Sequence, residues 1–420
     1  MIGLKNYDKK RRELYAPLKE EGIFTWETMY NQEYALATIK EVTSSFLKEI
    51  REATLQLGKI FAKVAMIVQN GSTELLQDLG LPSETWSTIR LVVDRSIPTV
   101  VGRFDFANTP AGLKMLEFNS DTPSGVVEAY YVNEKVCQYF DFPDPNQGCR
   151  DHIRLAFDRI VQVYQKMGYP TDHIYFSSLG WHIEDRGTTK FLMKESGLQA
   201  SFIPLKQLAI HKEGLFAFEK ETNSYKPIHV LFRLHPMEIM AKEKDKQNQP
   251  IGAYLLHLIA KQKVAIINPP NAFISQTKAL QALIWNLHKE NHSFFTPEEH
   301  EVIETYMLPT YLENPFKGKK GYVRKPFFGR EGGAVTLFDK DGQELDKDQN
   351  KQYWDQPMIY QELVELETVE VPTLKGMFQG KLLWGSFLMG GKPSAVLARI
   401  DRNITGDMSY LLPIGLSDGA

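Results

Sequence analysis

Four polar residues that suit metal and phosphate chemistry lie close together in an otherwise apolar stretch of the sequence. They stand on either side of a short segment that contains Pro and Gly, and they are Arg103, Asp105, Glu117 and Asn119. Carboxylate and amide oxygens are ligands that Mg²⁺ takes beside substrate phosphates, and a nearby Arg neutralises charge on a transferring phosphoryl group. The pattern therefore indicates a metal and phosphate site. Its alternative is a solvated hairpin face with cross-strand ion pairs.

An antiparallel hairpin would bring these four side chains together. Residues 100–106 and 113–118 alternate roughly between polar and apolar, and the Pro and Gly between them favour a chain reversal. Because side chains alternate between the two faces of a strand, a register centred on Ala111 places all four on one face. This register pairs Arg103 with Asn119 and Asp105 with Glu117.

Turn residues follow the second apolar run and precede a segment with a helical pattern. Residues 121–125 read Asp-Thr-Pro-Ser-Gly and lead into residues 126–140. We expect a helix there, with Thr122 or Ser124 as its cap. The amides at its N-terminus would then be placed to receive a substrate carboxylate or phosphate.

A second cluster, over residues 322–335, combines a strand, a Gly-rich loop and another apolar strand. The strand carries Lys325, and the loop reads Gly329-Arg330-Glu331-Gly332. A Lys on a strand reaches phosphate oxygens, and Gly lets backbone N–H groups approach a phosphate closely. The loop matches neither the P-loop nor the Rossmann motif. We interpret it as a phosphate lid, with a plain hairpin turn as the alternative.

The remaining pattern predicts an α/β protein. Residues 33–69 have helical spacing, residues 151–168 predict another helix, and a strand at 173–178 precedes an acidic turn at His182, Glu184 and Asp185 and a helix through Lys194. Further strands are expected at 230–233, 263–270 and 358–364, with a helix from Thr277. We expect three parts of one unit: a helical segment over 1–98, an α/β region over 99–290 and a nucleotide-binding and lid region over 291–420.

Near the C-terminus we expect a hairpin through Gly390 and Gly391, followed by a loop. Arg399, Asp401 and Arg402 crowd together in that predicted loop. Without other information, the simplest interpretation of these three residues is a surface ion-pair cluster.

Composition excludes several classes of function. The chain has 420 residues and a formal net charge of -3 with no basic cluster, which argues against nucleic-acid binding. No apolar run is long enough to span a membrane, and the N-terminus lacks the pattern of a secretory signal, so we expect a cytoplasmic protein. Cys137 and Cys149 have no Cys/His partners at metal-binding spacing, and we expect each to be a lone buried thiol.

In combination, these segments resemble the synthetase half of glutathionylspermidine synthase and its stand-alone relatives, a family similar to ATP-grasp enzymes. The resemblance extends over nearly the whole chain. It rests on Gly102-Arg103-x-Asp105, Glu117-x-Asn119, Asp121-Thr-Pro-Ser124, Asn268-Pro-Pro, Lys278, Leu283-Ile-Trp285, the loop after Lys325, and Tyr360-Gln361. It implies an ATP-grasp-like fold with α/β and α+β elements, and an ADP-forming ligase that joins a carboxylate to an amine through an acyl phosphate.

The resemblance also implies a role for each matching residue. Mg²⁺ would lie on Asp105, Glu117 and Asn119, and Arg103 and Arg399 would act at the reacting groups. ATP would be held by Arg103, Lys278, Lys325, Gly329, Arg330, Glu331, Gly332, Gln361, Glu362, Leu363, Val364, Ile404 and Thr405. Substrates would contact Thr122, Ser124, Glu184 and Asp185, of which the last two match acidic positions that recognise the amine and the peptide.

Because of two departures from the family pattern, the resemblance does not identify the substrates. Ile239 stands where the resembled synthetase has a Thr that touches the peptide, and Leu383 replaces a polar nucleotide contact. The expected substrates are a small carboxylate, glutathione or another peptide or amino acid, and a polyamine-like amine. A nucleotide-binding regulatory protein is the alternative from another class. The segment before the hairpin is too short for the family's amidase domain and has no Cys, so we expect no amidase activity.

Overall fold

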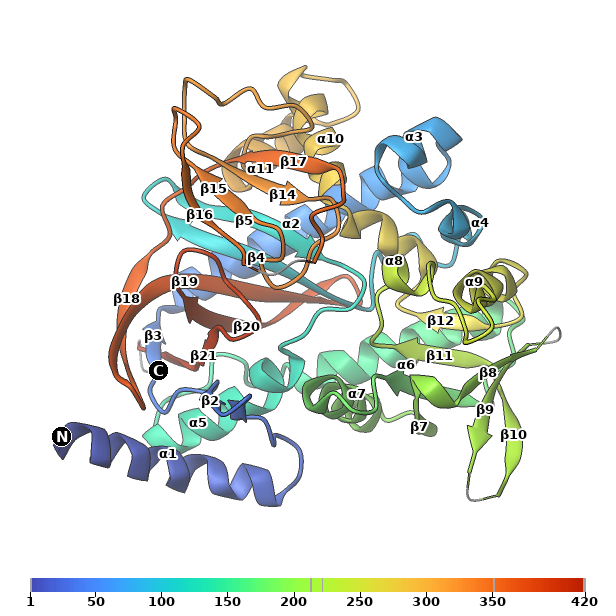
Figure 1. Ribbon diagram of the computed structural model, residues 1–420, viewed down its shortest axis with the longest axis horizontal. Helices are drawn as coiled ribbons and strands as arrows, with labels where there is room; N and C mark the ends of the chain where they lie inside the picture. The colour runs from blue at the N-terminus through green and yellow to red at the C-terminus, as the bar shows by residue number, and fades with distance from the viewer. Residues whose placement is uncertain (1, 212–213, 221, 350–351, 418–420) are drawn as a thin grey trace.

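The computed structural model describes residues 2–211, 214–220, 222–349 and 352–417, with side chains described from residue 6 onward. Its central feature is an antiparallel sheet of six strands that joins a hairpin from the first third of the chain to strands near the C-terminus (Figure 1). The strand order is β21-β20-β19-β4-β5, with β18 paired to β19. The strands are β4 (Val101–Thr109), β5 (Gly112–Asn119), β18 (Thr368–Thr373), β19 (Gly376–Met389), β20 (Lys392–Asp401) and β21 (Tyr410–Leu412).

Alternation along β4 and β5 gives this sheet one core face and one polar face. The ring of Phe104 stacks on that of Phe118 with centroids 3.8 Å apart, and Phe61 of helix α2 (Ser44–Gln69) packs edge-on against both. Arg103 and Asp105 flank Phe104 in the sequence, so their side chains leave the opposite face of the strand. Packing against α2 therefore fixes which way the polar residues point.

Helix α2 is shorter than its apolar spacing predicts. The helix expected over 33–69 begins only at Ser44, where the side chain of Thr43 caps it by accepting a hydrogen bond from the Phe46 amide at 3.2 Å. Residues Lys40–Val42 form strand β3 instead, in parallel with β22 (Ile414–Leu416). The helix prediction is wrong for residues 33–43 because a partner strand from the far end of the chain holds part of this segment extended.

A four-stranded parallel sheet forms a second layer and confirms the predicted α/β alternation. Its order is β12-β11-β6-β7, and helix α7 packs against β6 and β7. The elements of this region are β6 (Ile174–Ser178), β7 (Ala200–Pro204), β11 (Val230–Arg233), β12 (Ala265–Ile267), α6 (Arg150–Lys166), α7 (Ile183–Glu195), α8 (Met237–Met240) and α9 (Ile251–Ala260). The strands predicted at 173–178, 230–233 and 263–270 and the helix at 151–168 are all present.

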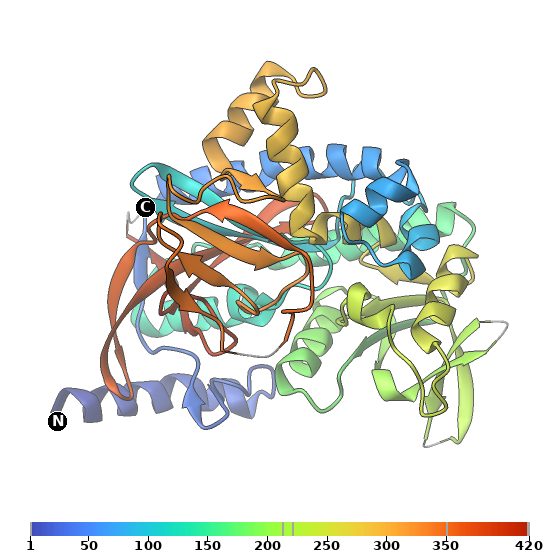
Figure 2. The same ribbon diagram turned by 45° about the horizontal axis from the view of Figure 1, so that its top comes forward.

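A third sheet, of five antiparallel strands, lies beside the β4–β5 hairpin in both ribbon views (Figures 1 and 2). The ammonium of Lys325 and the amide of Gln361, both on this sheet, donate to the backbone carbonyl of Leu116 in β5 at 3.3 and 3.5 Å. The strands run in the order β13 (Thr310–Tyr311), β17 (Met358–Glu362), β14 (Tyr322–Pro326), β15 (Thr336–Phe338) and β16 (Glu344–Lys347). The Gly-rich loop connects β14 to β15.

The other elements surround these three sheets. They are α1 (Ile2–Glu20), β1 (Thr28–Met29), β2 (Gln32–Glu33), α3 (Thr73–Asp78), η1 (Ser83–Thr85), α4 (Trp86–Ile89), η2 (Glu128–Val132), α5 (Asn133–Phe140), η3 (Leu205–Gln207), β8 (Leu208–His211), β9 (Gly214–Glu219), β10 (Ser224–Ile228), η4 (Pro270–Gln276), α10 (Lys278–Lys289) and α11 (Pro297–Tyr306). Cys137 and Cys149 are buried and unpaired, as predicted. In the described ranges, no helix is long and apolar enough to cross a membrane.

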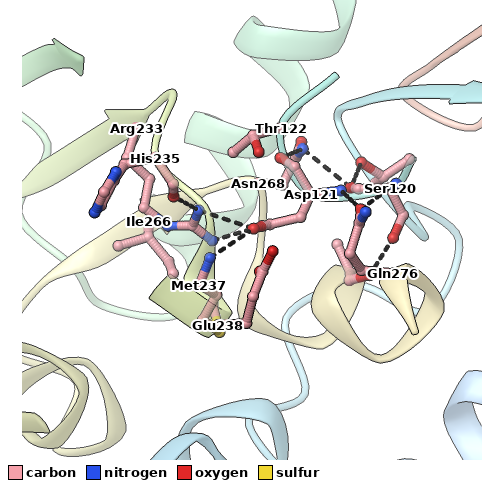
Figure 3. A network of polar contacts seen from close by, with 12 residues as sticks. Ser120, Asp121, Thr122, Arg233, His235, Met237, Glu238, Ile266, Asn268 and Gln276 are labelled. Atoms are coloured by element: carbon pink, nitrogen blue, oxygen red, sulfur yellow. Dashed lines mark hydrogen bonds and ion pairs between the residues drawn. The ribbon is translucent and has the colours of Figure 1, made fainter. Parts of the chain in front are cut away.

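A buried polar network joins the hairpin to the parallel sheet (Figure 3). The guanidinium of Arg233, at the end of β11, donates to both carboxylate oxygens of Asp121 at 2.6 and 3.1 Å, and both side chains are almost fully buried. The amide nitrogen of Asn268 donates to the carbonyls of Val101, Ser120 and Asp121. The network therefore sets the position of the chain between β5 and the turn that follows it.

Replacing Asp121 by Ala will destabilise the fold strongly, because it leaves the Arg233 guanidinium buried without its counter-charge. We expect a loss of about 3–5 kcal/mol in the free energy of unfolding, measured by urea denaturation. The control is Asp8→Ala, which breaks the exposed ion pair of Asp8 with Arg12 and should change stability by less than about 0.5 kcal/mol. Equal effects of the two substitutions would contradict a structural role for the buried pair.

Candidate active site

The hairpin pairs the four polar residues as the sequence predicts, although its turn differs from the prediction. Arg103 lies opposite Asn119, and Asp105 lies opposite Glu117. Nearer the turn, Thr109 pairs with Gly112, which is a tighter register than one centred on Ala111. A bulge between Asp105 and Phe106 shifts the register by one residue. The predicted pairs are therefore confirmed, and a two-residue turn combined with a bulge produces them.

Asp105 is held between two guanidinium groups at the centre of this face. Arg103 donates to both of its carboxylate oxygens at 2.6 and 2.9 Å, and Arg399 donates to one of them at 3.0 Å. Burial lowers the pKa of Arg103, but the charge and hydrogen bonds of Asp105, together with the charge of Glu117, raise it by more in sum, so the guanidinium stays charged. Arg399 lies within strand β20 and not in a loop, so the expected surface cluster with Asp401 and Arg402 is wrong. A long-range pairing with Asp105 takes its place.

Glu117 is the second carboxylate, and it contacts an ammonium group and an amide. Its side chain lies 3.1 Å from the Lys278 ammonium and accepts a hydrogen bond from Asn119 at 3.2 Å. Burial raises the pKa of Glu117, but the charges of Lys278 and Lys325 and the hydrogen bonds from Asn119 and Lys278 together lower it by more, so its pKa lies below the usual range. The carboxylate is therefore fully ionised at neutral pH.

Lys325 is the most strongly perturbed cation of the site. Its ammonium donates to the side-chain oxygen of Gln361 at 2.7 Å, and the side chain is buried. Burial lowers the pKa of Lys325 to about 8, while the charge of Glu117 acts in the opposite direction. An ammonium with a depressed pKa gains most from a ligand that brings negative charge.

The Gly-rich loop packs closely against the loop after β20. A side chain at Gly332 would come within 2.7 Å of both Ile404 and the Thr405 carbonyl, and Gly332 has a φ of +70°. Only glycine adopts this conformation at such close approach without strain. The predicted nucleotide residues of the two loops are therefore brought side by side.

Arg330 anchors the same loop to two other parts of the chain. It donates to the hydroxyl and the carbonyl of Thr122, and its Nε lies 3.6 Å from a carboxylate oxygen of Glu238 on α8. Burial raises the pKa of Glu238, while the charge of Arg330 acts against that rise. Sequence analysis missed Glu238, because its partner is 92 positions further along the chain and no local pattern connects the two.

The predicted capping role of Thr122 and Ser124 is wrong. The helical segment begins at Val126, and neither hydroxyl accepts a hydrogen bond from one of its backbone amides. The hydroxyl of Thr122 accepts from Arg330, and the carbonyl of Ser124 accepts from Arg103 at 2.6 Å. Two arginines from other parts of the chain therefore bind the polar groups of this turn, and the turn does not cap the helix.

Several carboxylates lie close together beside Arg103 and Arg399. Glu184 and Asp185 form the first turn of α7 and not a separate acidic turn, because His182 caps that helix. Burial and the neighbouring charges of Glu128 and Glu331 raise the pKa of Glu184 well above its usual value. The pKa values of Glu128 and Glu331 are raised as well, chiefly by burial. Asp185 lies 3.1 Å from the His182 ring instead and raises the pKa of that His through this hydrogen bond.

One cavity of about 1180 Å³ is lined by most of these groups, although Glu128 and Glu238 are not among its lining residues. Every residue proposed from the sequence as a metal, nucleotide or substrate contact lines it, from Arg103 on β4 to Thr405 after β20. Its volume exceeds the roughly 300–1,000 Å³ of ordinary ligand pockets, so more than one small molecule fits. Among the described residues, no group of three or more His, Cys, Asp or Glu could hold a metal ion. Of the three residues predicted to hold a metal, Asp105 and Glu117 supply carboxylates and Asn119 supplies an amide, so only two of them are of those four types.

Comparison with known proteins assigns the fold and the family. The fold is of the glutathione synthetase-like ATP-grasp type. A solved structure of a glutathione synthetase-like effector from Globodera pallida, in its apo form, superposes with a TM-score of 0.55 at 13% identity. That superposition covers 90% of this chain and 89% of the effector. At this identity, the likeness concerns the fold alone.

The family is defined by sequence. The family described as "Glutathionylspermidine synthase preATP-grasp" matches residues 5–417, and the chain belongs to it. This chain is 25% identical over 350 residues to a Haemophilus influenzae protein described as "Putative acid--amine ligase". The alignment covers 75% of this chain and 74% of that protein. Both comparisons support a ligase.

Removing the charge of Glu117 will lower the pKa of Lys325 further. In Glu117→Gln we expect a value clearly below about 8, because the anion that favours the ammonium is lost while burial remains. The measurement is a pH titration of ¹³C-labelled lysines by NMR, with Lys325→Arg used to assign the signal. The control is Glu362→Gln, whose carboxylate pairs with exposed Lys320 at 2.7 Å. An unchanged or raised Lys325 pKa in Glu117→Gln would refute this coupling.

Proposed function

We propose that this protein is an ATP-dependent acid–amine ligase that forms ADP and an amide through an acyl phosphate. The observation that carries the proposal is the convergence of four cations and two carboxylates on one wall of a large cavity. They are Arg103, Lys278, Lys325, Arg399, Asp105 and Glu117. Such a wall has more positive than negative charge, and it favours the polyphosphate of a nucleotide.

The nucleotide would occupy the space between the five-stranded sheet and the hairpin. Lys278 and Lys325 would bind its phosphates, and the loop over residues 329–332 would cover them. Residues 361–364 leave strand β17 along the same cavity and would line the adenine, with Ile404 and Thr405 on the facing loop. Both lysines already contact anionic or carbonyl oxygens, which a phosphate would replace.

The donor set at the hairpin fits Mg²⁺. Asp105, Glu117 and Asn119 present only oxygen ligands, and each carboxylate oxygen accepts more than one bond. Three protein ligands suffice because Mg²⁺ in nucleotide sites completes its octahedron with phosphates and water. When bound, the ion neutralises phosphate charge and aligns the terminal phosphoryl group.

The chain's own residues would position and stabilise the reacting groups. Arg103 and Arg399, fixed by Asp105, would neutralise the substrate carboxylate and the charge that develops as its oxygen displaces ADP from the γ-phosphorus. The amine nitrogen then attacks the acyl carbon, and the C–O bond to phosphate breaks. A carboxylate with a raised pKa, such as Glu184, is suited to take the proton that the amine loses.

The carboxylate cluster supports a polyamine-like acceptor. A small recess beside Arg103 and Arg399 is lined by Glu128, Glu184, Glu331 and Asp407. Buried carboxylates that repel one another are stabilised by a cation, and an ammonium group supplies one. Among the two acidic residues proposed from the sequence, Glu184 faces this recess, whereas Asp185 is held by His182.

The acid substrate is glutathione or another peptide or amino acid. Ile239 is 39% exposed and lines the cavity, and Leu383 lines it while mostly buried. Ile239 places hydrocarbon where the resembled synthetase has a Thr that touches the peptide, which favours an acid other than glutathione, whereas Leu383 stands at a nucleotide contact. The competing function, a nucleotide-binding regulatory protein, has no specific feature in its favour beyond the nucleotide site itself.

Purified protein with Mg-ATP should release ADP only in the presence of a suitable acid and amine. We expect ADP and an amide product by mass spectrometry when a panel of carboxylates that includes glutathione is combined with amines that include spermidine. Glu117→Gln should reduce this activity on the order of 10²-fold or more, because a ligand of the phosphate-bound ion is lost. The matched control is Glu370→Gln, an exposed carboxylate on β18 of the same sheet. Nucleotide binding without ADP release for every pair would point to the regulatory function.

Glu184 should control the affinity for the amine. Glu184→Gln removes one charge-assisted contact worth about 1.5–3 kcal/mol, so the KM for a polyamine should rise roughly 10- to 100-fold. The KM for ATP should stay the same. Asp185→Asn serves as the comparison and should change the amine KM less, because Asp185 is engaged by His182. A larger effect in Asp185→Asn would assign the amine contact to that residue instead.

A further inference from the structure

One wall of the cavity is apolar and open to solvent. Trp181 is 75% exposed and Ile239 is 39% exposed, and both line the cavity. Leu179, Leu234 and Pro236 line it beside them. Large exposed apolar side chains that meet in a concave surface mark a binding site for an apolar group.

The wall stands at the carboxyl edge of the parallel sheet. Leu179 and Trp181 follow β6, while Leu234 and Pro236 follow β11, and these two strands are paired neighbours. The Leu234 amide donates to the Ser177 carbonyl at 2.9 Å, which ties the two connections together. Open α/β sheets bind ligands at this edge, and the strand ends hold the wall in a fixed shape.

Four charged or titratable side chains that neighbour the wall in the sequence already have partners within the protein. Arg233 is bound to Asp121, the Glu238 carboxylate lies near the Arg330 guanidinium, and His182 lies against Asp185. His235 also lies 3.0 Å from Glu243. A charged group of a substrate placed against Trp181 and Ile239 would exchange water for hydrocarbon, and that exchange is unfavourable. A hydrocarbon group loses nothing and gains from burial.

We propose that this wall is the subsite for an apolar side chain of the acid substrate, so that the enzyme selects peptide or amino-acid carboxylates with hydrophobic side chains over glutathione. The inference rests on the proposed ligase function. The acid is assigned to the wall because the carboxylate recess beside Arg103 and Arg399 attracts the cationic amine. The carboxylate of the acid would reach the two arginines while its side chain lies along Trp181 and Ile239.

The test compares two dipeptides that differ in one side chain, leucylglycine and alanylglycine, with the tripeptide glutathione. With Mg-ATP and the best amine of the panel, we expect kcat/KM for leucylglycine to exceed that for alanylglycine by about 10-fold or more, as hydrophobic pockets discriminate added methylenes. Ile239→Thr and Trp181→Ser should each reduce this ratio several-fold. Leu374→Thr is the matched control, because Leu374 is also 39% exposed but lies outside the cavity, and it should leave the ratio unchanged.

Calorimetric binding of the same acids, in the presence of a non-hydrolysable ATP analogue, separates this inference from the ligase proposal. Turnover without preference for leucylglycine, or with preference for glutathione, would overturn the apolar subsite and leave the ligase standing. Selective binding of leucylglycine that Ile239→Thr weakens, without any ADP release, would support the subsite and overturn the ligase. Neither turnover nor selective binding would overturn both. A side-chain preference that follows the amine and not the acid would also overturn the assignment.

Discussion

The arrangement of this protein depends on the pairing of charges that its fold removes from water. Burying an isolated charge is costly, so each ionised group needs a partner held at close range. Asp105 satisfies two guanidinium groups, and Glu117 satisfies the Lys278 ammonium. Among the described residues, the hydrogen-bond partners of Lys325 are neutral, and its pKa falls to about 8 as a result of burial. One wall therefore has an excess of positive charge, while the recess around Glu184 has an excess of carboxylates. This difference in charge would separate the proposed place for a polyphosphate from the proposed place for an ammonium group.

Three sheets must meet for these pairs to exist, and the buried network around Asp121 sets their junction. The hairpin carries Asp105 and Glu117, and the five-stranded sheet carries Lys325. The parallel sheet contributes the residues that follow β6 and β11 and line the cavity. Asp121 follows the hairpin directly and is bonded to Arg233 of the parallel sheet and to the Met237 amide at the start of α8. The same residue thus fixes the hairpin against the helix that carries Glu238 and Ile239. Asp121, Arg233 and Met237 do not line the cavity themselves, yet their hydrogen bonds determine the positions of the residues that do.

Sequence reasoning succeeded where a local rule decides the outcome. Strand alternation sufficed to place Arg103, Asp105, Glu117 and Asn119 on one face, since Phe104 and Phe118 must face α2. The correct pairs appeared in spite of a wrong turn, because the bulge shifts the register back to the predicted one at the site. Reasoning failed where a distant partner overrides a local preference. Residues 40–42 fit a helical pattern but form a strand that pairs with residues 414–416. Arg399 binds the Asp105 carboxylate, which is distant in the sequence, and not the nearby Asp401. Glu238 has no local signal at all.

Helix α8 connects the two substrate-facing features of the cavity. Its four residues include Glu238, which lies near Arg330 of the Gly-rich loop, and Ile239, which forms part of the apolar wall. Adjacent residues on so short a helix cannot move independently, because each shift of the backbone displaces both side chains. The Asp121 carboxylate accepts a hydrogen bond from the Met237 amide at 3.0 Å, so the start of this helix is tied to the end of the β4–β5 hairpin. The loop that would cover the nucleotide, the wall that would receive the acid and the hairpin that would hold the metal are therefore linked through α8 and Asp121. Asp121 also forms the fully buried ion pair with Arg233.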